Sequence, residues 1–360
     1  HSLMSLVYPK QQSDMVKSML SIYDESGWLP KWELNATETT TMVGDPAGIV
    51  IADTYLRGIQ DFDVEKAYRA MIKSATQLEK NVLRPGIKEY TEKGYLTTAS
   101  TKSGSVSTTQ EYNTTDFAIA QLAKVLGKKE DEQFYRERSI SYRKLFDKEF
   151  NLLRPKDKDN LWITPFNPET GANFQKNLGF IEGNSWQYTF MVSHDVTGLM
   201  KLMGGKEAYS TKLQKVFDIG QFDMANEPDI GYPFLFNYVA GQEWRTQKTV
   251  SELISNYFKN TPDGLPGNDD TGTMSAWLVF SMMGIYPISP AEPTYTITTP
   301  VFDKITIQLD SRYYKNNQLV IEKFGHGKIN KIQIDGKTKN PYFISHKALV
   351  EGNNLKIKLK

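Results

Sequence analysis

The sequence contains no cysteine, which excludes disulfide bonds, thiolate metal sites and cysteine nucleophiles. Its four histidines are too scattered along the 360 residues for a histidine-based zinc site. No apolar run reaches the roughly 18–20 residues that a membrane helix needs, so no membrane span is predicted. The 43 basic and 42 acidic residues nearly cancel, and the chain therefore lacks the basic field expected of a nucleic-acid binder.

The remaining composition leaves carboxylate chemistry open. The hydrophobic fraction of 39% and the charged fraction of 24% are near the globular average, and the chain is long enough to bury a sizeable core. An aromatic fraction of 12%, with 6 Trp and 19 Tyr, suits a sugar-binding surface.

Residues 1–290 are predicted to be helical. Apolar residues recur at helical spacing between Gly and Pro, and this pattern predicts helices joined by short turns, one of them over 131–150. Asp63 is predicted to cap the start of the helix that follows it. The helix lengths and their pairing favour a closed barrel of helical hairpins over a four-helix bundle.

Residues 291–360 are predicted to form a small antiparallel β region. Apolar and polar residues alternate in TYTITT, KITIQLD, QLVIEK, INKIQID and LKIKLK, with turn signals between them. Five such strands seldom stand alone, so we expect another part of the protein to cover their apolar face.

Glu182 is the first candidate for chemistry. It lies between aromatic and apolar residues at a helix start, and such surroundings desolvate a carboxylate, raise its pKa and suit it to act as a general acid. The alternative is that Glu182 caps the helix.

Asp269 and Asp270 stand side by side in a glycine-rich loop before another helix. Their mutual repulsion predicts that a cation, a catalytic base or a sugar hydroxyl makes use of them. Asp270 could cap the helix at Thr273 by itself, which would leave Asp269 without a structural role.

Asn226 and Glu227 belong to an oxygen-rich loop without nitrogen or sulfur donors. Such a loop favours a hard cation, calcium rather than zinc. The alternative is an ordinary helix start with Pro228 in its first turn. Further upstream, Trp28 or Trp32 could stack on a sugar ring, although a Trp buried in the core is the commoner case.

Four blocks in chain order resemble the signature of glycoside hydrolase family 92: WLPKWELN…VGDPAGIVIADTYLRG, EGNSWQY…HD, NEPD…YPFLF and GLPGNDDTGTMSAW…GIYP. Members of this family are calcium-dependent exo-acting α-mannosidases that invert the anomeric configuration. The resemblance covers nearly the whole chain. It implies a mainly α fold, with an (α/α)6 barrel over 1–290 followed by the antiparallel strands of 291–360. It also implies an N-terminal β-sandwich before Leu3, as part of a longer chain or as a separate one, on which these strands would pack.

The resemblance implies a role for each candidate residue. Glu182 would be the general acid and Asp270 the general base, with Asp269 assisting or binding sugar hydroxyls. Asn226 and Glu227 would hold Ca2+, which grips O2 and O3 of the terminal mannose. Asp45 would bind that mannose, with Trp32 and Gln187 as weaker candidates for sugar contacts.

The substrate class implies a secreted or periplasmic protein, although the first residues, HSLMSLVYPKQQ, do not resemble a signal peptide. Two alternatives stay open. The chain could be a non-catalytic glycan-binding fragment of such an enzyme, or another (α/α)6 glycosidase related to glucosidases or trehalases. The sequence does not indicate the mannosidic linkage.

Overall fold

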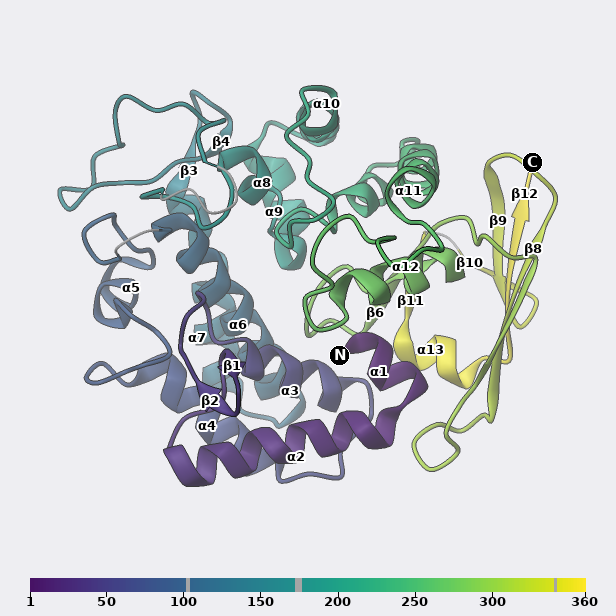
Figure 1. Ribbon diagram of the computed structural model, residues 1–360, viewed down its shortest axis with the longest axis horizontal. Coiled ribbons are helices and arrows are strands. Elements are labelled where there is room, and N and C mark those ends of the chain that lie inside the picture. The colour runs from purple at the N-terminus through teal and green to yellow at the C-terminus, as the bar shows by residue number, and fades with distance from the viewer. Residues whose placement is uncertain (102–103, 172–176, 340–341) are drawn as a thin grey trace.

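The computed structural model describes residues 1–101, 104–171, 177–339 and 342–360. Over these residues the protein is mainly helical, as predicted, with its larger β-sheets toward the C-terminus (Figure 1). The first helices are α1 (Ser2–Val7), α2 (Pro9–Ser26), α3 (Pro46–Leu56), α4 (Val64–Thr76), α5 (Ile87–Lys93), α6 (Ser105–Val125) and α7 (Lys129–Arg138). The later ones are α8 (Ser185–Thr189), α9 (Val196–Leu202), α10 (Lys206–Asp218), α11 (Glu243–Tyr257), α12 (Thr273–Met283) and α13 (His346–Glu351).

Short 3-10 helices and strands complete the described part of the chain. The 3-10 helices are η1 (Ser141–Leu145), η2 (Ser193–Asp195) and η3 (Tyr232–Tyr238). Two small hairpins lie among the helices, formed by β1 (Glu33–Leu34) with β2 (Thr37–Glu38) and by β3 (Phe146–Asp147) with β4 (Leu152–Leu153). The C-terminal strands are β5 (Ile285–Tyr286), β6 (Thr294–Ile297), β7 (Lys304–Gln308), β8 (Gln318–Phe324), β9 (Ile329–Ile334), β10 (Lys337–Lys339), β11 (Phe343–Ser345) and β12 (Asn354–Leu359).

Local sequence signals determine several helix ends. The carboxylate of Asp63 accepts a hydrogen bond of 2.9 Å from the N–H of Lys66, which confirms the predicted cap of α4. Helix α2 ends at Gly27, whose φ of 77° lies in the left-handed region and lets its N–H reach the carbonyl of Tyr23.

The prediction of a single helix over 131–150 is wrong. Helix α7 ends at Arg138, η1 follows, and the chain then turns into the β3–β4 hairpin. Asn151 adopts a φ of 55° in the turn, and Arg154 reaches back to Asp147 with an ion pair of 2.8 Å. A buried pair that spans the hairpin outweighs the weak helical periodicity of this segment.

The five predicted strands are confirmed as β6, β7, β8, β9 and β12, but the prediction that they are all antiparallel is wrong. The larger sheet has the order β10-β9-β12-β8-β7, and β12 runs parallel to β8 while pairing antiparallel with β9. Parallel neighbours require a crossover connection, and α13 lies in the segment that carries the chain back to insert β12 between them. The smaller sheet has the order β11-β6-β5.

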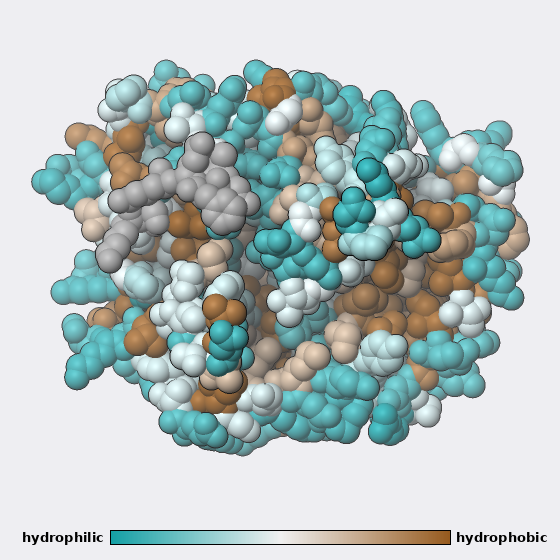
Figure 2. Space-filling view, in the orientation of Figure 1, coloured by the Kyte–Doolittle hydropathy of each residue, from teal (hydrophilic) through white to brown (hydrophobic). Residues whose placement is uncertain are grey.

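The apolar face of the larger sheet packs on helices of the same chain. Leu6 of α1 and Phe280 of α12 share one core cluster with Ile321 of β8 and Leu355 of β12. The alternate residues of these strands, such as Lys356 and Lys358, reach solvent. Figure 2 shows apolar residues gathered over the junction of α12 with the strands, on a face that is otherwise largely hydrophilic.

Candidate active site

Glu182 lies in the tight turn that leads into α8, with a φ of 49°. The cap of this helix is Asn184, whose side-chain oxygen accepts the N–H groups of Trp186 and Gln187 at 2.9 and 3.2 Å. In return the side-chain oxygen of Gln187 accepts the N–H of Asn184 at 3.2 Å, which completes a capping box. The alternative role of Glu182 as the helix cap is therefore filled by Asn184. Among the described residues, nothing is hydrogen-bonded to the carboxylate of Glu182.

Asn226 ties the oxygen-rich loop to the turn of Glu182. Its side-chain amide donates a hydrogen bond of 2.7 Å to the main-chain carbonyl of Glu182, and its own side chain is buried. The next residue, Glu227, has a carboxyl whose pKa is raised by burial and by the negative charges of Asp270 and Glu182. The structure thus brings Glu182 and Asp270, from two different loops, within electrostatic reach of Glu227.

Asp269 and Asp270 have different surroundings. The carboxylate of Asp269 accepts the N–H of Ser275 at 2.8 Å and its hydroxyl at 3.0 Å, and so it caps the first turn of α12. The structural alternative, in which the side chain of Asp270 caps this helix, is therefore not what the structure shows. Only the main-chain carbonyl of Asp270 takes part, accepting the hydroxyl of Thr273 at 2.8 Å.

The backbone explains this division. Asp270, Thr271 and Gly272 adopt successive φ values of 45°, 57° and 93°, so that three consecutive residues lie in the left-handed region, which costs free energy for the two that are not glycine. The carboxylate of Asp270 is exposed, and no hydrogen bond reaches it within the described part of the chain.

Asp45 is held at the start of α3 by a buried ion pair. Its carboxylate accepts Nε of Arg84 at 2.9 Å, and both side chains are almost completely buried. The second carboxylate oxygen of Asp45 is buried without a hydrogen-bond partner among the described residues. Burial raises the pKa of this carboxyl although Arg84 opposes that shift. Trp32, by contrast, is 43% exposed next to the β1–β2 hairpin.

Glu111 on α6 joins this group, although it is absent from the sequence-predicted set. Burial, together with the charges of Glu227 and Asp45, raises the pKa of its carboxyl to about 8, although the charge of Lys31 opposes the shift. A signal was present in the sequence: Glu111 is the only acidic residue from Gly104 to Thr115, and no basic residue lies one helical turn away.

The donors available for a cation are oxygen atoms. Asn226 offers a side-chain carbonyl and Glu227 a carboxylate, the donor types that calcium prefers. Among the residues that the structure describes, no cluster of three or more His, Cys, Asp or Glu side chains is arranged to hold a metal ion. Water and substrate hydroxyls would have to supply most of the remaining ligands.

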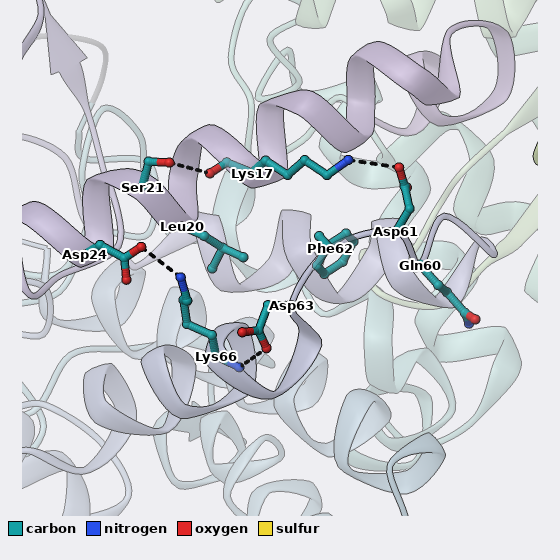
Figure 3. A pocket seen from close by; sticks show the side chains of 9 residues that line it. All are labelled: Lys17, Leu20, Ser21, Asp24, Gln60, Asp61, Phe62, Asp63 and Lys66. Carbon is teal, nitrogen blue, oxygen red and sulfur yellow. Dashed lines mark hydrogen bonds and ion pairs between the residues drawn. The ribbon is translucent and has the colours of Figure 1, made fainter.

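A cavity of about 450 Å3 opens elsewhere, between α2 and the segment that leads into α4 (Figure 3). Its charged side chains pair with one another, Lys17 with Asp61 at 2.9 Å and Lys66 with Asp24 at 2.8 Å. None of the candidate site residues lines it. With its charges already satisfied, this cavity gives no indication of a charged ligand.

No helix within the described ranges combines the length and the apolar character that a membrane crossing needs. A protein-family model described as "Glycosyl hydrolase family 92 catalytic domain" matches residues 1–360 of the sequence. An uncharacterized secreted glycosidase of Arthroderma benhamiae is 28% identical over 96% of this chain and 49% of its own length.

Two solved structures from Bacteroides thetaiotaomicron are similar over 99% of this chain. A family GH92 α-mannosidase in complex with mannoimidazole has a TM-score of 0.92 and 30% sequence identity, and 49% of its length is covered. A family GH92 inverting mannosidase has a TM-score of 0.88 and 27% identity, and 51% of its length is covered. The chain thus spans about half the length of these relatives. It belongs to glycoside hydrolase family 92, the α-mannosidase family, and carries its catalytic domain.

Proposed function

We propose that this chain is the catalytic region of an exo-acting α-mannosidase that removes terminal α-mannosyl residues from glycans with inversion. The observation that carries the proposal is that Glu182 and Asp270, which come from two different loops, both lie close enough to Glu227 for their charges to add to the effect of burial in raising the pKa of its carboxyl. Asn184 and Asp269 perform the structural capping in the two loops, which leaves Glu182 and Asp270 uncommitted. A solved relative binds mannoimidazole and another is an inverting mannosidase, which supports the substrate class and the stereochemistry.

In this proposal Glu182 protonates the departing glycosidic oxygen, and Asp270 removes a proton from the attacking water. An inverting hydrolase needs roughly 6.5–9.5 Å between these two carboxyl groups, so that water fits between base and sugar. Asp269 assists by fixing the loop of Asp270 through Ser275, and its carboxylate stays a candidate for a sugar hydroxyl.

Asn226 and Glu227 are the residues that would hold Ca2+. The concentration of negative charge at Glu227 fits a divalent cation, because binding one would relieve the repulsion that raises the pKa of this carboxyl. When bound, calcium supplies charge stabilisation and orients vicinal hydroxyls, here O2 and O3 of mannose.

Asp45 is proposed to bind the terminal mannose through the oxygen that Arg84 leaves free. Trp32 is exposed enough to stack on a sugar. Gln187 is a weaker candidate, since its side chain is buried and its oxygen belongs to the capping box.

We further propose that the helices form an (α/α)6 barrel over 1–290 and that the strands of 291–360 contact an N-terminal β-sandwich, in a protein that is secreted or periplasmic. The relatives of about twice the length support a further domain beyond the residues of this chain, and the secreted fungal relative supports the localisation. The polar outer face of the larger sheet is the surface left for such a contact, because its apolar face is already packed against α1 and α12.

The test is hydrolysis of an aryl α-mannoside, followed by NMR of the first-formed sugar. We expect β-mannose, loss of activity with EDTA, and a decrease of about 100-fold or more in Glu182→Gln, the usual contribution of a general acid. Glu207→Gln, an exposed glutamate on α10, is the matched control. Both this chain and its native open reading frame are assayed, because the relatives are about twice as long.

Each other outcome selects a different function. First-formed α-mannose contradicts the roles of Glu182 and Asp270, and activity that survives EDTA contradicts the calcium site. Hydrolysis of aryl α-glucosides instead of mannosides indicates another (α/α)6 glycosidase. Mannoside binding without turnover, in both forms of the protein, indicates a glycan-binding fragment.

A further inference from the structure

Gly267 lies three residues before Asp270 and packs directly on the oxygen-rich loop, residues 223–230. A Cβ built on Gly267 would lie 2.8 Å from Cβ of Ala225, well inside the ordinary carbon–carbon contact of about 3.5–4.0 Å. Gly267 is not among the glycines with a positive φ, so its backbone does not require a glycine. The close approach of Ala225 is therefore what excludes a side chain at this position.

The oxygen-rich loop is held firmly by buried hydrogen bonds. The carboxyl of Asp229, which is completely buried, accepts the N–H of Asp223 at 2.8 Å and so closes the loop on itself. The end of the loop is joined to α12, because Nε1 of the buried Trp277 donates to the carbonyl of Ile230 at 2.9 Å. Closely packed segments resist displacement, so we expect the exposed loop of Gly267 to yield first when the two loops collide.

Asn226, the neighbour of Ala225 in the sequence, contacts the turn of the proposed general acid. Its side-chain amide donates to the main-chain carbonyl of Glu182 at 2.7 Å. A Cβ built on Gly183 would lie 3.5 Å from Nδ2 of the same amide. Two adjacent residues of one firmly held loop thus contact the segments that carry the proposed acid and the proposed base.

We propose that Gly267 is a positioning residue, whose contact with Ala225 sets the place of Asp270 relative to Glu182. The inference rests on the proposed function. An inverting hydrolase needs its acid and its base at a defined separation, and the oxygen-rich loop between their two segments would maintain it. A side chain at position 267 would have to move the loop of Asp270 by about 1 Å to reach ordinary contact. A misplacement of that size can lower the rate about 100-fold.

The test is a pair of substitutions that first create and then relieve the collision, assayed at saturating calcium. Gly267→Ala adds the Cβ, and we expect kcat for an aryl α-mannoside to fall about 10- to 100-fold while KM changes less than about 3-fold. Ala225→Gly removes the atom that this Cβ meets, so the double variant should recover to within about 3-fold of Ala225→Gly alone.

Gly231→Ala is the matched control. Gly231 has a φ of −80°, and a Cβ built on it would meet only Cδ1 of Ile288, at an ordinary distance of 3.4 Å. This variant therefore adds the same methyl group without a collision, and its kcat is expected to stay within about 3-fold of the wild type.

The leaving group of the substrate shows which carboxyl is displaced. A dinitrophenyl α-mannoside needs little protonation of its leaving group, whereas a methoxyphenyl α-mannoside depends on the general acid. The loss of kcat in Glu182→Gln should therefore be at least about 10-fold smaller on the dinitrophenyl substrate. The loss in Gly267→Ala should be equal on both substrates within about 3-fold, because the base acts in both reactions. A loss that shrinks as it does in Glu182→Gln would overturn the assignment of the contact to Asp270.

Crystal structures of the wild type, Gly267→Ala and the double variant give a readout other than activity. The distance between the carboxyl carbons of Glu182 and Asp270 is expected to change by about 1 Å in Gly267→Ala and to return in the double variant. Urea unfolding should differ by less than about 1 kcal/mol, because Gly267 is exposed. An unchanged distance, or a double variant no more active than Gly267→Ala, overturns the inference.

The inference and the proposed function fail in different ways. The variants are made in the form of the protein that hydrolyses the mannoside, this chain or its native open reading frame. Wild-type kcat in Gly267→Ala overturns the inference and leaves the proposed function intact. Absence of hydrolysis by both wild-type forms overturns the proposed function, and the inference falls with it.

Discussion

The side-chain amide of Asn226 donates a hydrogen bond of 2.7 Å to the main-chain carbonyl of Glu182. Glu182 has a φ of 49°, a left-handed conformation that costs a non-glycine residue about 1–2 kcal/mol. The bond from Asn226 is one of the contacts that hold the residue there. It connects the proposed calcium loop directly with the proposed general acid.

This hydrogen bond predicts that two substitutions of Asn226 differ in their effects on calcium affinity and on kcat. Asn226→Asp keeps the oxygen ligand but loses the N–H donor, so we expect calcium affinity to persist while kcat at saturating calcium falls at least about 10-fold. Asn226→Ala is expected to lose calcium affinity as well as kcat. Calcium titration with kinetics checks this, with the exposed Asn256→Ala as control. If kcat at saturating calcium stays at the wild-type value in Asn226→Asp, the connection does not position the acid.

The adjacent aspartates predict a separation of stability from catalysis. Asp269→Asn weakens the cap on α12 and is expected to lower the free energy of unfolding by about 1 kcal/mol. Asp270→Asn removes the proposed base without removing a hydrogen bond of its carboxylate, so we expect near-normal stability and loss of activity by about 100-fold or more. Urea unfolding and kcat are measured for both variants. If Asp269→Asn instead lost activity and Asp270→Asn lost stability, Asp269 would be the base and Asp270 the cap.

Local signals in the sequence were sufficient for part of this site. The helix caps and the alternation of the C-terminal strands depend on residues that are neighbours in the sequence. The motifs predicted Glu182, Glu227 and Asp270 as site residues, and the fold places Glu182 and Asp270 within electrostatic reach of Glu227. The assignment of Asp269 as the cap depends on three successive left-handed residues, which the sequence permits but does not require.

Long-range features could not be derived in this way. The parallel pairing of β12 with β8 depends on which gap in the sheet the last strand enters. Glu111 becomes part of the site only because α6 packs between two loops that are about 135 residues apart in the sequence. Alternating patterns and local motifs carry no information about either arrangement.

Calcium is expected to stabilise the protein. A ligand at 100 times its Kd adds about 2.7 kcal/mol to the free energy of unfolding, provided that it binds only the folded state. We therefore expect calcium to raise the melting temperature of the wild type, and EDTA to reverse the increase. Glu227→Gln should lose this response, whereas the exposed control Glu207→Gln should keep it. An equal increase in wild type and Glu227→Gln would place the ion elsewhere.

Asp116 is expected to be among the residues most important for stability. It is completely buried and accepts hydrogen bonds from Arg84 at 2.9 Å, from Arg138 at 2.6 Å and from Tyr90 at 2.7 Å. Asp116→Asn leaves two buried guanidinium groups without this countercharge, which predicts a loss of about 3–5 kcal/mol in unfolding free energy.

The control for Asp116 is a surface pair. Lys10 and Asp14 form an exposed ion pair on α2, and Asp14→Asn is expected to change stability by less than about 0.5 kcal/mol. Because Arg84 also holds Asp45, Asp116→Asn should weaken mannoside binding even at temperatures where the variant is folded. If Asp116→Asn loses less than about 1 kcal/mol of unfolding free energy, the two arginines must find other partners or water.

The pKa of Glu111 predicts how stability changes with pH. The pKa of its carboxyl rises from 4.5 in the unfolded chain to about 8 in the folded protein. Below the lower value both states are protonated. Between the two values the unfolded chain releases its proton first, so the contribution of this group to stability falls as the pH rises, and above about 8 the deficit is constant. Glu111→Gln removes the group, so its free energy of unfolding minus that of the wild type should increase from pH 5 to pH 8 and then level off. Urea titrations of both proteins in EDTA measure this difference without bound calcium, and a difference that does not change with pH would mean that Glu111 ionises as easily in the folded protein as in the unfolded chain.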